Sequence, residues 1–171
     1  MLSNAKLLNE LRNNCGELQI NTIRDDLLNF DKHTQKGVEL VVCMTDTIVH
    51  LESKEKIISL FDKVFEALEP KGKFILTFRD LTHELQELDR FLPVKSDENI
   101  IFTCFLEYET EAVKVHDIVY KKSLGEWRLF KSFYRKIRLS KDWVGRTLLD
   151  SGFSEIDSKV EKGFVTVIAA K

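Results

Sequence analysis

The stretch from Val38 to Met44 constrains the fold of this chain more than any other. Its sequence, Val-Glu-Leu-Val-Val-Cys-Met, is almost continuously apolar. Such a run is typical of a strand that is covered on both faces in a parallel α/β sheet. Small polar residues follow it directly, and a helical pattern comes next. Because ligands in open α/β sheets bind beyond the carboxyl ends of the strands, we expect the chemistry of this protein between Cys43 and Asp46.

Composition narrows the class of protein. The 171 residues are enough for one domain with a sizeable core. The net charge is −2 with both signs interspersed, so the sequence lacks the basic stripe of a nucleic-acid-binding protein. No apolar segment approaches the ~20 residues of a membrane helix, and residues 1–3 do not open a signal peptide. Three widely spaced cysteines favour a reducing, cytoplasmic location, and the four histidines show no metal-ligand spacing.

The first half of the chain predicts strands that alternate with helices. Apolar spacing predicts a helix at about 4–14, and alternation predicts a strand at Glu17–Ile23. Ser53 is a good N-cap for a second helix that runs to about Leu68. The sequence Glu-Pro-Lys-Gly at 69–72 ends that helix in a turn, and a buried strand follows at 73–78. This order favours crossover connections and a parallel sheet.

The second half predicts antiparallel structure. Three strand-like stretches follow a break at Pro93 and form a β-meander inserted at about residues 98–138; they lie at 100–106, 112–120 and 127–138. A helix begins at Ser140 and ends before Gly152, and a hairpin closes the chain with strands at 155–161 and 164–170. We find no repeat and no linker, so we expect a single domain over residues 1–171.

Four short motifs stand in a fixed order along the chain. They are Asp25-Asp26-Leu27 ahead of Asn29-Phe30, Val41–Thr47 with His50-Leu51, the Leu-Glu-Pro-Lys-Gly passage within 65–74, and Leu-Leu-Asp-Ser-Gly-Phe at 148–153. Their order and spacing resemble the class I S-adenosylmethionine-dependent methyltransferase family. The resemblance implies an α/β fold with a Rossmann-like methyltransferase sheet, mostly parallel and closed by an antiparallel C-terminal hairpin. It also implies that the inserted meander roofs the active site, as in small-molecule methyltransferases.

Part of the family's pattern has no counterpart in this sequence. The glycine-rich G-x-G loop after the family's first strand is absent, and so is the acid after its second strand. The first helix of the chain resembles the one that follows the family's strand two. The resemblance therefore implies either a truncated methylating enzyme or a remnant that no longer binds cofactor.

Two alternatives to an enzyme remain open. One is a dimeric interaction or scaffold protein, in which the strand at 38–44 would become a sheet edge. The segment at 17–23 or a second copy of the chain would then pair with that edge. The other is a ligand-binding α+β domain with an apolar cavity beneath the meander.

The resemblance implies a site for S-adenosylmethionine. Asp26 would accept a hydrogen bond from the adenine amine and the Leu27 amide would donate to the ring, with Asp25 as the alternative acid. The backbone at the end of the 38–44 strand would pass the methionine portion; its residues are Cys43, Met44 and Thr45. The competing interpretation of Asp25 and Asp26 is a solvated turn in which an aspartate caps its own backbone. We expect Cys43 to be a buried packing residue with a protonated thiol.

The resemblance also implies where a small-molecule methyl acceptor binds. Asp46 and His50 are candidate general bases, which are needed only if the acceptor arrives protonated, because the cofactor carries the hard chemistry. Arg79 is a candidate clamp for a substrate carboxylate, or else a local partner of Asp80. Further candidate substrate contacts lie on the meander: Tyr108, His116, Tyr134 and Arg135. Side-chain alternation places Arg135 and Tyr134 on opposite faces of their strand.

Overall fold

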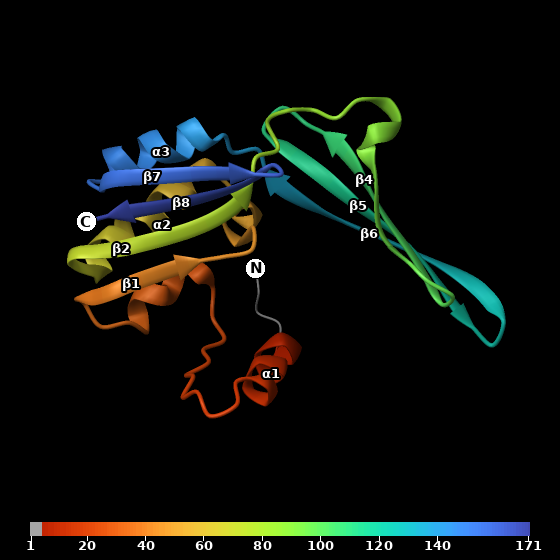
Figure 1. The fold of residues 1–171 in the computed structure, drawn as a ribbon, viewed down its shortest axis with the longest axis horizontal. Coiled ribbons are helices and arrows are strands. Elements are labelled where there is room, and N and C mark those ends of the chain that lie inside the picture. The colour runs from red at the N-terminus through yellow and green to blue at the C-terminus, as the bar shows by residue number, and fades with distance from the viewer. Residues whose placement is uncertain (1–4) are drawn as a thin grey trace.

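Two four-stranded sheets lie side by side in the computed structural model of the protein, which describes residues 5–171 (Figure 1). The first sheet has the strand order β1-β2-β8-β7, and the second has the order β3-β4-β5-β6. The strands of the first sheet are β1 (Val38–Cys43), β2 (Leu68–Arg79), β7 (Ser154–Glu161) and β8 (Phe164–Ala170). Those of the second sheet are β3 (Phe91–Ser96), β4 (Ile100–Tyr108), β5 (Ala112–Ser123) and β6 (Glu126–Ile137).

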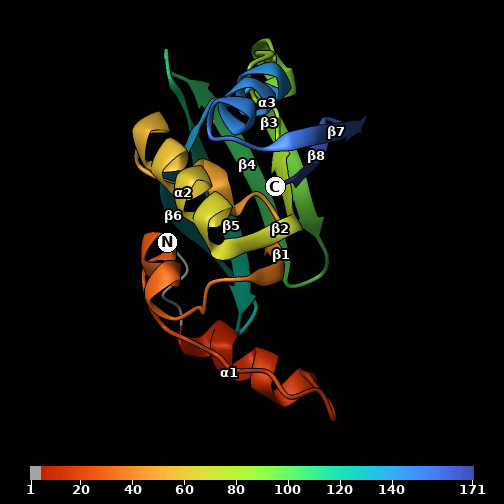
Figure 2. The same ribbon diagram turned by 90° about the vertical axis from the view of Figure 1, so that its left-hand side faces the viewer.

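The helices lie mainly on one side of the first sheet. Helices α2 (Lys54–Ala67) and α3 (Lys141–Asp150) cover one of its faces, whereas α1 (Ala5–Asn14) stands apart from both sheets (Figure 1 and Figure 2). Three short 3-10 helices complete the described secondary structure: η1 (Leu27–Lys32), η2 (Thr47–His50) and η3 (Glu87–Arg90). Within residues 5–171, no helix is long and apolar enough to cross a membrane.

The first sheet combines parallel and antiparallel pairing. Strands β1 and β2 are parallel, with Val42 opposite Ile75, and α2 forms the connection between them. Strand β8 runs antiparallel to β2 on one side and to β7 on the other. The predicted parallel pair and the C-terminal hairpin are therefore confirmed, and the parallel pairing is confined to β1 and β2.

The core lies between the first sheet and the helices α2 and α3. Ile57, Phe61 and Val64 form an apolar stripe along α2 and are almost completely buried. Alternate residues of β2 pack against this stripe and are fully buried; they are Phe74, Leu76 and Phe78. Burial of such side chains stabilises the fold by roughly 1.5–3 kcal/mol each.

Local capping sets the bounds of α2 and α3. The Ser53 hydroxyl accepts a hydrogen bond from the Lys56 amide at 3.3 Å, which satisfies one free donor at the start of α2. Gly152 follows α3 with φ at +100°, and its amide donates to the Leu149 carbonyl at 2.9 Å. A Cβ at this position would also lie 2.9 Å from the Phe65 ring, so a larger residue does not fit there.

Strand β1 is an edge strand, which corrects the prediction of an inner strand covered on both faces. Cys43 is buried in the core, but Leu40 and Val42 on the opposite face are 52% and 55% exposed. The predicted strand at Glu17–Ile23 is wrong as well, because these residues have no regular secondary structure. A strand needs a ladder partner and a face to bury, and within residues 5–171 none pairs with the free edge of β1.

The second sheet is the predicted β-meander with one additional strand. Strands β4, β5 and β6 match the three predicted stretches, and β3 pairs with β4 ahead of them. The register between β3 and β4 shifts between Pro93 and Lys95, which is how an edge strand accommodates proline. The β5–β6 hairpin extends beyond the rest of the molecule (Figure 1).

The two faces of the second sheet have different surroundings. The face that we call the inner face packs near Leu81, after β2, through three buried side chains: Leu106, Val113 and Val115. The opposite, outer face carries a row of rings from four neighbouring strands: Phe91, Phe105, His116 and Phe133. Which face a meander residue belongs to therefore decides whether it points toward the first sheet.

Candidate functional site

A cavity of about 350 Å³ lies between η1, η2 and the start of α2. Its volume falls within the range of roughly 300–1,000 Å³ that small-molecule pockets occupy. Its lining combines the predicted acidic turn with the end of η2 and includes Asp25, Asp26, Leu27, Leu28, His50, Leu51 and Lys56. Since η2 follows β1 directly, the cavity lies near the carboxyl end of this strand, where the sequence predicts the chemistry.

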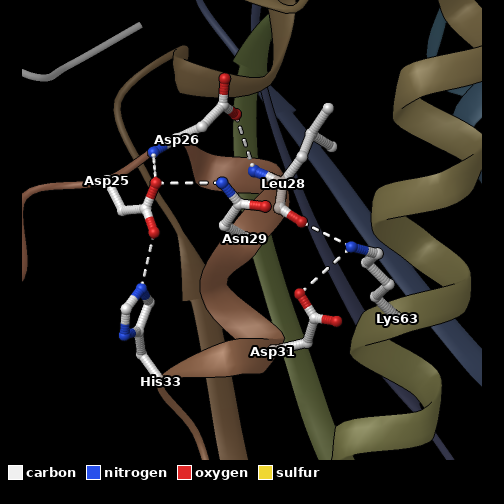
Figure 3. A network of polar contacts seen from close by, with 7 residues as sticks. All are labelled: Asp25, Asp26, Leu28, Asn29, Asp31, His33 and Lys63. Atoms are coloured by element: carbon white, nitrogen blue, oxygen red, sulfur yellow. Dashed lines mark hydrogen bonds and ion pairs between the residues drawn. The ribbon is translucent and has the colours of Figure 1, made fainter.

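Asp25 organises the turn that precedes η1 (Figure 3). Its Oδ1 accepts hydrogen bonds from the Asp26 amide at 2.7 Å and from Asn29 Nδ2 at 3.0 Å. Its Oδ2 lies 2.7 Å from His33 Nε2. These three donors, of which His33 has the largest effect, hold the pKa of the Asp25 carboxyl far below its usual range. Both carboxylate oxygens of Asp25 are thus engaged within the turn.

Asp26 is arranged differently. Its Oδ1 accepts a hydrogen bond from the Leu28 amide at 2.9 Å and so caps η1. Among the described residues, nothing donates to its Oδ2, which Figure 3 shows turned away from the helix. Asp26 is one of the residues that line the cavity, and it retains this carboxylate oxygen as an acceptor. The turn therefore has one acid that holds it together and one that is available to a ligand.

Lys63 of α2 holds η1 against this helix (Figure 3). Its Nζ donates to the Leu28 carbonyl at 2.6 Å and to Asp31 Oδ1 at 3.1 Å. Because the sequence separation exceeds thirty residues, this contact depends on the packing of α2 against η1. It positions the wall of the cavity that carries Asp26.

The loop between β1 and η2 joins the two sheets. Asp46 is buried, and its Oδ1 accepts a hydrogen bond from the Arg79 amide at 2.8 Å. Its Oδ2 forms an ion pair with Lys136 of β6. The backbone of Asp46 has φ at +68°, in the left-handed region, so these two contacts hold a locally unfavourable conformation. Both oxygens of this candidate base therefore have partners in the protein.

His50 is the candidate base that reaches the cavity. Its ring lies 5.5 Å from that of Tyr134, centroid to centroid, and it lines the cavity beside Leu51. Partial burial, together with the nearby Lys136 ammonium, lowers the pKa of His50. The imidazole is consequently neutral at pH 7 and can accept a proton there.

Cys43, Met44 and Thr45 lie at the end of β1 and do not line the cavity. Met44 is 44% exposed, and the Thr45 amide donates to the Thr77 hydroxyl at 2.8 Å. Burial raises the pKa of the Cys43 thiol to about 11. A thiol with this pKa stays protonated at neutral pH, as expected for a packing residue.

Alkylation provides a direct check on the cysteines. Burial also raises the pKa of Cys104 to about 11, with a further contribution from the Asp117 carboxylate. At about pH 8 both thiols are protonated, so iodoacetamide should modify them slowly. Mass spectrometry of the folded protein should show that Cys15, which is not buried, is modified first. Modification of Cys43 at the same rate as Cys15 would contradict the burial of the β1 end.

The candidate substrate residues divide between the two faces of the meander. Tyr134 lies on the inner face, next to His50. His116 and Arg135 lie on the outer face, where His116 stacks between Phe105 and Phe133. His116 pairs with Glu107 at 2.7 Å, and Arg135 pairs with Glu109 at 2.9 Å. The structure therefore does not bring His116 and Arg135 together with the cavity.

Tyr108 and Arg79 also lie outside the cavity. The Tyr108 hydroxyl accepts a hydrogen bond from the Leu85 amide at 3.1 Å and helps to hold the segment that leads into η3. The Arg79 guanidinium lies over the Phe164 ring at 5.6 Å. In place of the anticipated pair with Arg79, Asp80 accepts hydrogen bonds from the Thr82 and Lys141 amides.

Several residues near the cavity were not found from the sequence. His33 and Lys56 line it, and Lys136 neutralises Asp46. Asp117 lies on the inner face of β5 and had no sequence signal at all. The sequence did contain a signal for His33: it follows Asp25 by eight residues, and one short helix lies between them. Over the described range 5–171, no group of three or more His, Cys, Asp or Glu residues could hold a metal ion.

Comparison with known proteins identifies similar structures but no sequence relatives. No family model matches the chain, and no curated protein matches it. Among solved structures, a methyltransferase from Clostridium acetobutylicum that depends on S-adenosylmethionine is 15% identical, with a TM-score of 0.77 over 98% of this chain and 72% of that one. CcbJ methyltransferase from Streptomyces caelestis is 15% identical, with a TM-score of 0.77 over 96% and 70% of the two chains.

A third structure was determined with its cofactor. CalS10, an amino pentose methyltransferase from Micromonospora echinaspora, is 12% identical, with a TM-score of 0.77 over 98% of this chain and 70% of that one. That structure contains S-adenosylmethionine. At such identities the likeness concerns the fold, and it extends over nearly all of the present chain.

Proposed function

Because the chain has the class I S-adenosylmethionine-dependent methyltransferase fold, as the sequence motifs predicted, we propose that it binds this cofactor and methylates a small molecule. The observation that carries the proposal is the cavity beside the acidic turn, with Asp26 Oδ2 available as an acceptor. The neighbour CalS10 acts on an amino pentose, and this supports a small-molecule acceptor here.

The residues of the cavity fit the adenine end of the cofactor. Adenine presents an exocyclic amine that donates and ring nitrogens that accept. Asp26 Oδ2 supplies the acceptor, and among the described residues nothing accepts from the Leu27 amide, which supplies the donor. Leu28 and Leu51 give apolar walls for the ring. Both oxygens of Asp25 already have partners within the turn, whereas Asp26 Oδ2 has none among the described residues, so of the two acids we assign Asp26 to adenine.

The protein's part in the reaction is binding and orientation. When bound, S-adenosylmethionine supplies a methyl group on a sulfonium, which is already electrophilic. Alignment of acceptor and methyl group is then the main task of the site. His50 is placed to take a proton from the acceptor, since it is neutral and lines the cavity. Asp46 acts as a positioning residue that ties η2 to β6 through Lys136.

Isothermal titration with S-adenosylhomocysteine tests the proposal directly. We expect a saturable heat with the chain as it stands. Saturation at one site per chain would support cofactor binding, and absence of heat at millimolar ligand would refute it. The remaining sequence-based expectations continue as proposals: one domain over residues 1–171, a cytoplasmic location, and no nucleic-acid or membrane partner.

A second candidate function rests on the free edge of β1. The exposed Leu40 and Val42 lie on an edge whose backbone groups pair with no further strand of residues 5–171, and such an edge is a template for strand addition. A dimeric scaffold would use this edge to pair with a second copy. Sedimentation velocity should then show a dimer that Val42→Lys converts to monomer, because a charge is costly in a packed sheet face. A wild-type monomer at high micromolar concentration would exclude this candidate.

A further inference from the structure

We propose that the inner face of the meander binds a protonated amine of the acceptor molecule, with Asp117 as the partner of the ammonium group. This inference rests on the proposed function, which it extends to a substrate class. Asp117 lies in the middle of β5, opposite Cys104 of β4 and Ser132 of β6. Its Oδ1 accepts from Cys104 Sγ at 3.4 Å, and its Oδ2 accepts from Ser132 Oγ at 3.2 Å.

The charge of Asp117 is not compensated by the protein. Within residues 5–171, no lysine, arginine or histidine forms an ion pair with it. Two acids nearby do have cationic partners: Glu107 of β4 pairs with Lys114 and His116, and Glu109, just after β4, pairs with Arg135. A half-buried carboxylate that is held only by a thiol and a hydroxyl keeps its attraction for a cation. An external ammonium group would supply the missing charge.

The neighbours of Asp117 suit an amine that carries an apolar body. Along β6, Phe130 and Tyr134 flank Ser132 on the same face, two residues away in each direction. Diagonal neighbours of this kind on adjacent strands are within reach of aromatic side chains. A lysine of the chain already lies over each ring, Lys121 over Phe130 and Lys136 over Tyr134, both at 5.8 Å from the ring centroid, so the rings are left to cover the apolar body of the ligand. The inner face therefore offers a carboxylate between two rings.

A chain of side chains leads from this position toward the cavity. The Tyr134 ring on the same face lies 5.5 Å from that of His50, which lines the cavity. Burial raises the pKa of the Tyr134 hydroxyl, and the Asp117 carboxylate is the next largest cause. The negative field of Asp117 thus extends to the residue that contacts His50. An acceptor anchored at Asp117 would have its other end beside His50 and the cavity.

An NMR titration without cofactor tests the inference. The probe is phenethylamine, which is protonated at neutral pH, and the matched neutral probe is 2-phenylethanol. We expect phenethylamine to shift amide signals within 102–106, 115–119 and 130–134, and 2-phenylethanol to bind at least about tenfold more weakly, as expected for loss of a charged hydrogen bond. Equal binding of both probes, or shifts confined to other residues, would overturn the inference.

Three variants locate the effect. Asp117→Asn keeps one of the two oxygen acceptors, replaces the other with an NH2 donor and removes the charge, so it should weaken phenethylamine binding by about tenfold or more. Asp157→Asn removes an exposed carboxylate from β7, far along the first sheet, and should leave the binding unchanged. Ser132→Ala removes a hydrogen bond and keeps the charge, so binding should persist. Unchanged affinity in Asp117→Asn would overturn the inference.

The two proposals fail in distinguishable ways. Asp117 does not line the cavity, so Asp117→Asn should bind S-adenosylhomocysteine as the wild type does. Retained phenethylamine binding without any response to S-adenosylhomocysteine would remove the methyltransferase activity and leave an amine-binding face. Binding of S-adenosylhomocysteine without any binding of phenethylamine would support the proposed function and refute the amine site.

Discussion

Replacing Asp26 with asparagine is expected to abolish most of the affinity for S-adenosylhomocysteine. Asparagine caps a helix about as well as aspartate, so η1 should remain formed. The substitution replaces the available carboxylate with a neutral amide, which provides a weaker acceptor for the adenine amine. We expect a loss of about tenfold or more in affinity, measured by isothermal titration.

The matched control is Asp157→Asn, which makes the same chemical change on the exposed surface of β7. This variant should bind S-adenosylhomocysteine with wild-type affinity. Thermal melting of both variants should stay close to that of the wild type, which separates recognition from stability. Wild-type affinity in Asp26→Asn would mean that the acidic turn serves only to cap its own backbone.

Replacing Lys136 with methionine is expected to cause a large loss of stability. The ammonium of Lys136 pairs with Asp46 where the side chains are only 16% and 11% exposed. Removing one partner leaves a buried carboxylate whose remaining donor, among the residues that the structure describes, is the Arg79 amide. Urea denaturation should show a decrease of roughly 2–4 kcal/mol in the free energy of unfolding, since breaking a buried ion pair costs more than the pair contributes.

The double variant Asp46→Asn with Lys136→Met separates the two causes. It removes the uncompensated charge, so part of the lost stability should return. Lys56→Met is the matched control, because Lys56 pairs with Glu52 at side-chain exposures of 43% and 69%. That surface pair should contribute less than about 1 kcal/mol. Equal losses for Lys136→Met and Lys56→Met would show that the Asp46 contact does not join the two sheets.

The sequence predicted the ends of the helices well, because a few adjacent residues decide where a helix begins and ends. Ser53 caps α2 and Gly152 ends α3, as expected, because a hydroxyl acceptor and a positive φ act within one helical turn. The same locality explains the acidic turn. Asp25 and Asp26 receive hydrogen bonds from within eight residues, so their arrangement is encoded in a single segment.

Predictions that needed a distant partner were less successful. The alternating segment Glu17–Ile23 has the side chains of a strand, but pairing requires a neighbour that local sequence does not name. For the same reason the apolar run of β1 predicted a strand but not its place at the sheet edge. Pro93 suggested a break, whereas a bulge allowed β3 to pair with β4.

The order of the motifs and the periodicity of the apolar residues were enough to predict the class of fold. The sequence also separated the meander residues into two faces, because side chains alternate along a strand. Which face meets the first sheet became known from the folded protein, through the Lys136–Asp46 pair and the contact of Tyr134 with His50. Alternation fixes relative orientation within a strand, whereas the choice of the packed face depends on contacts between residues far apart in the chain. For that reason His116 and Arg135 lie away from the cavity, and Asp117 faces the side on which the cavity lies.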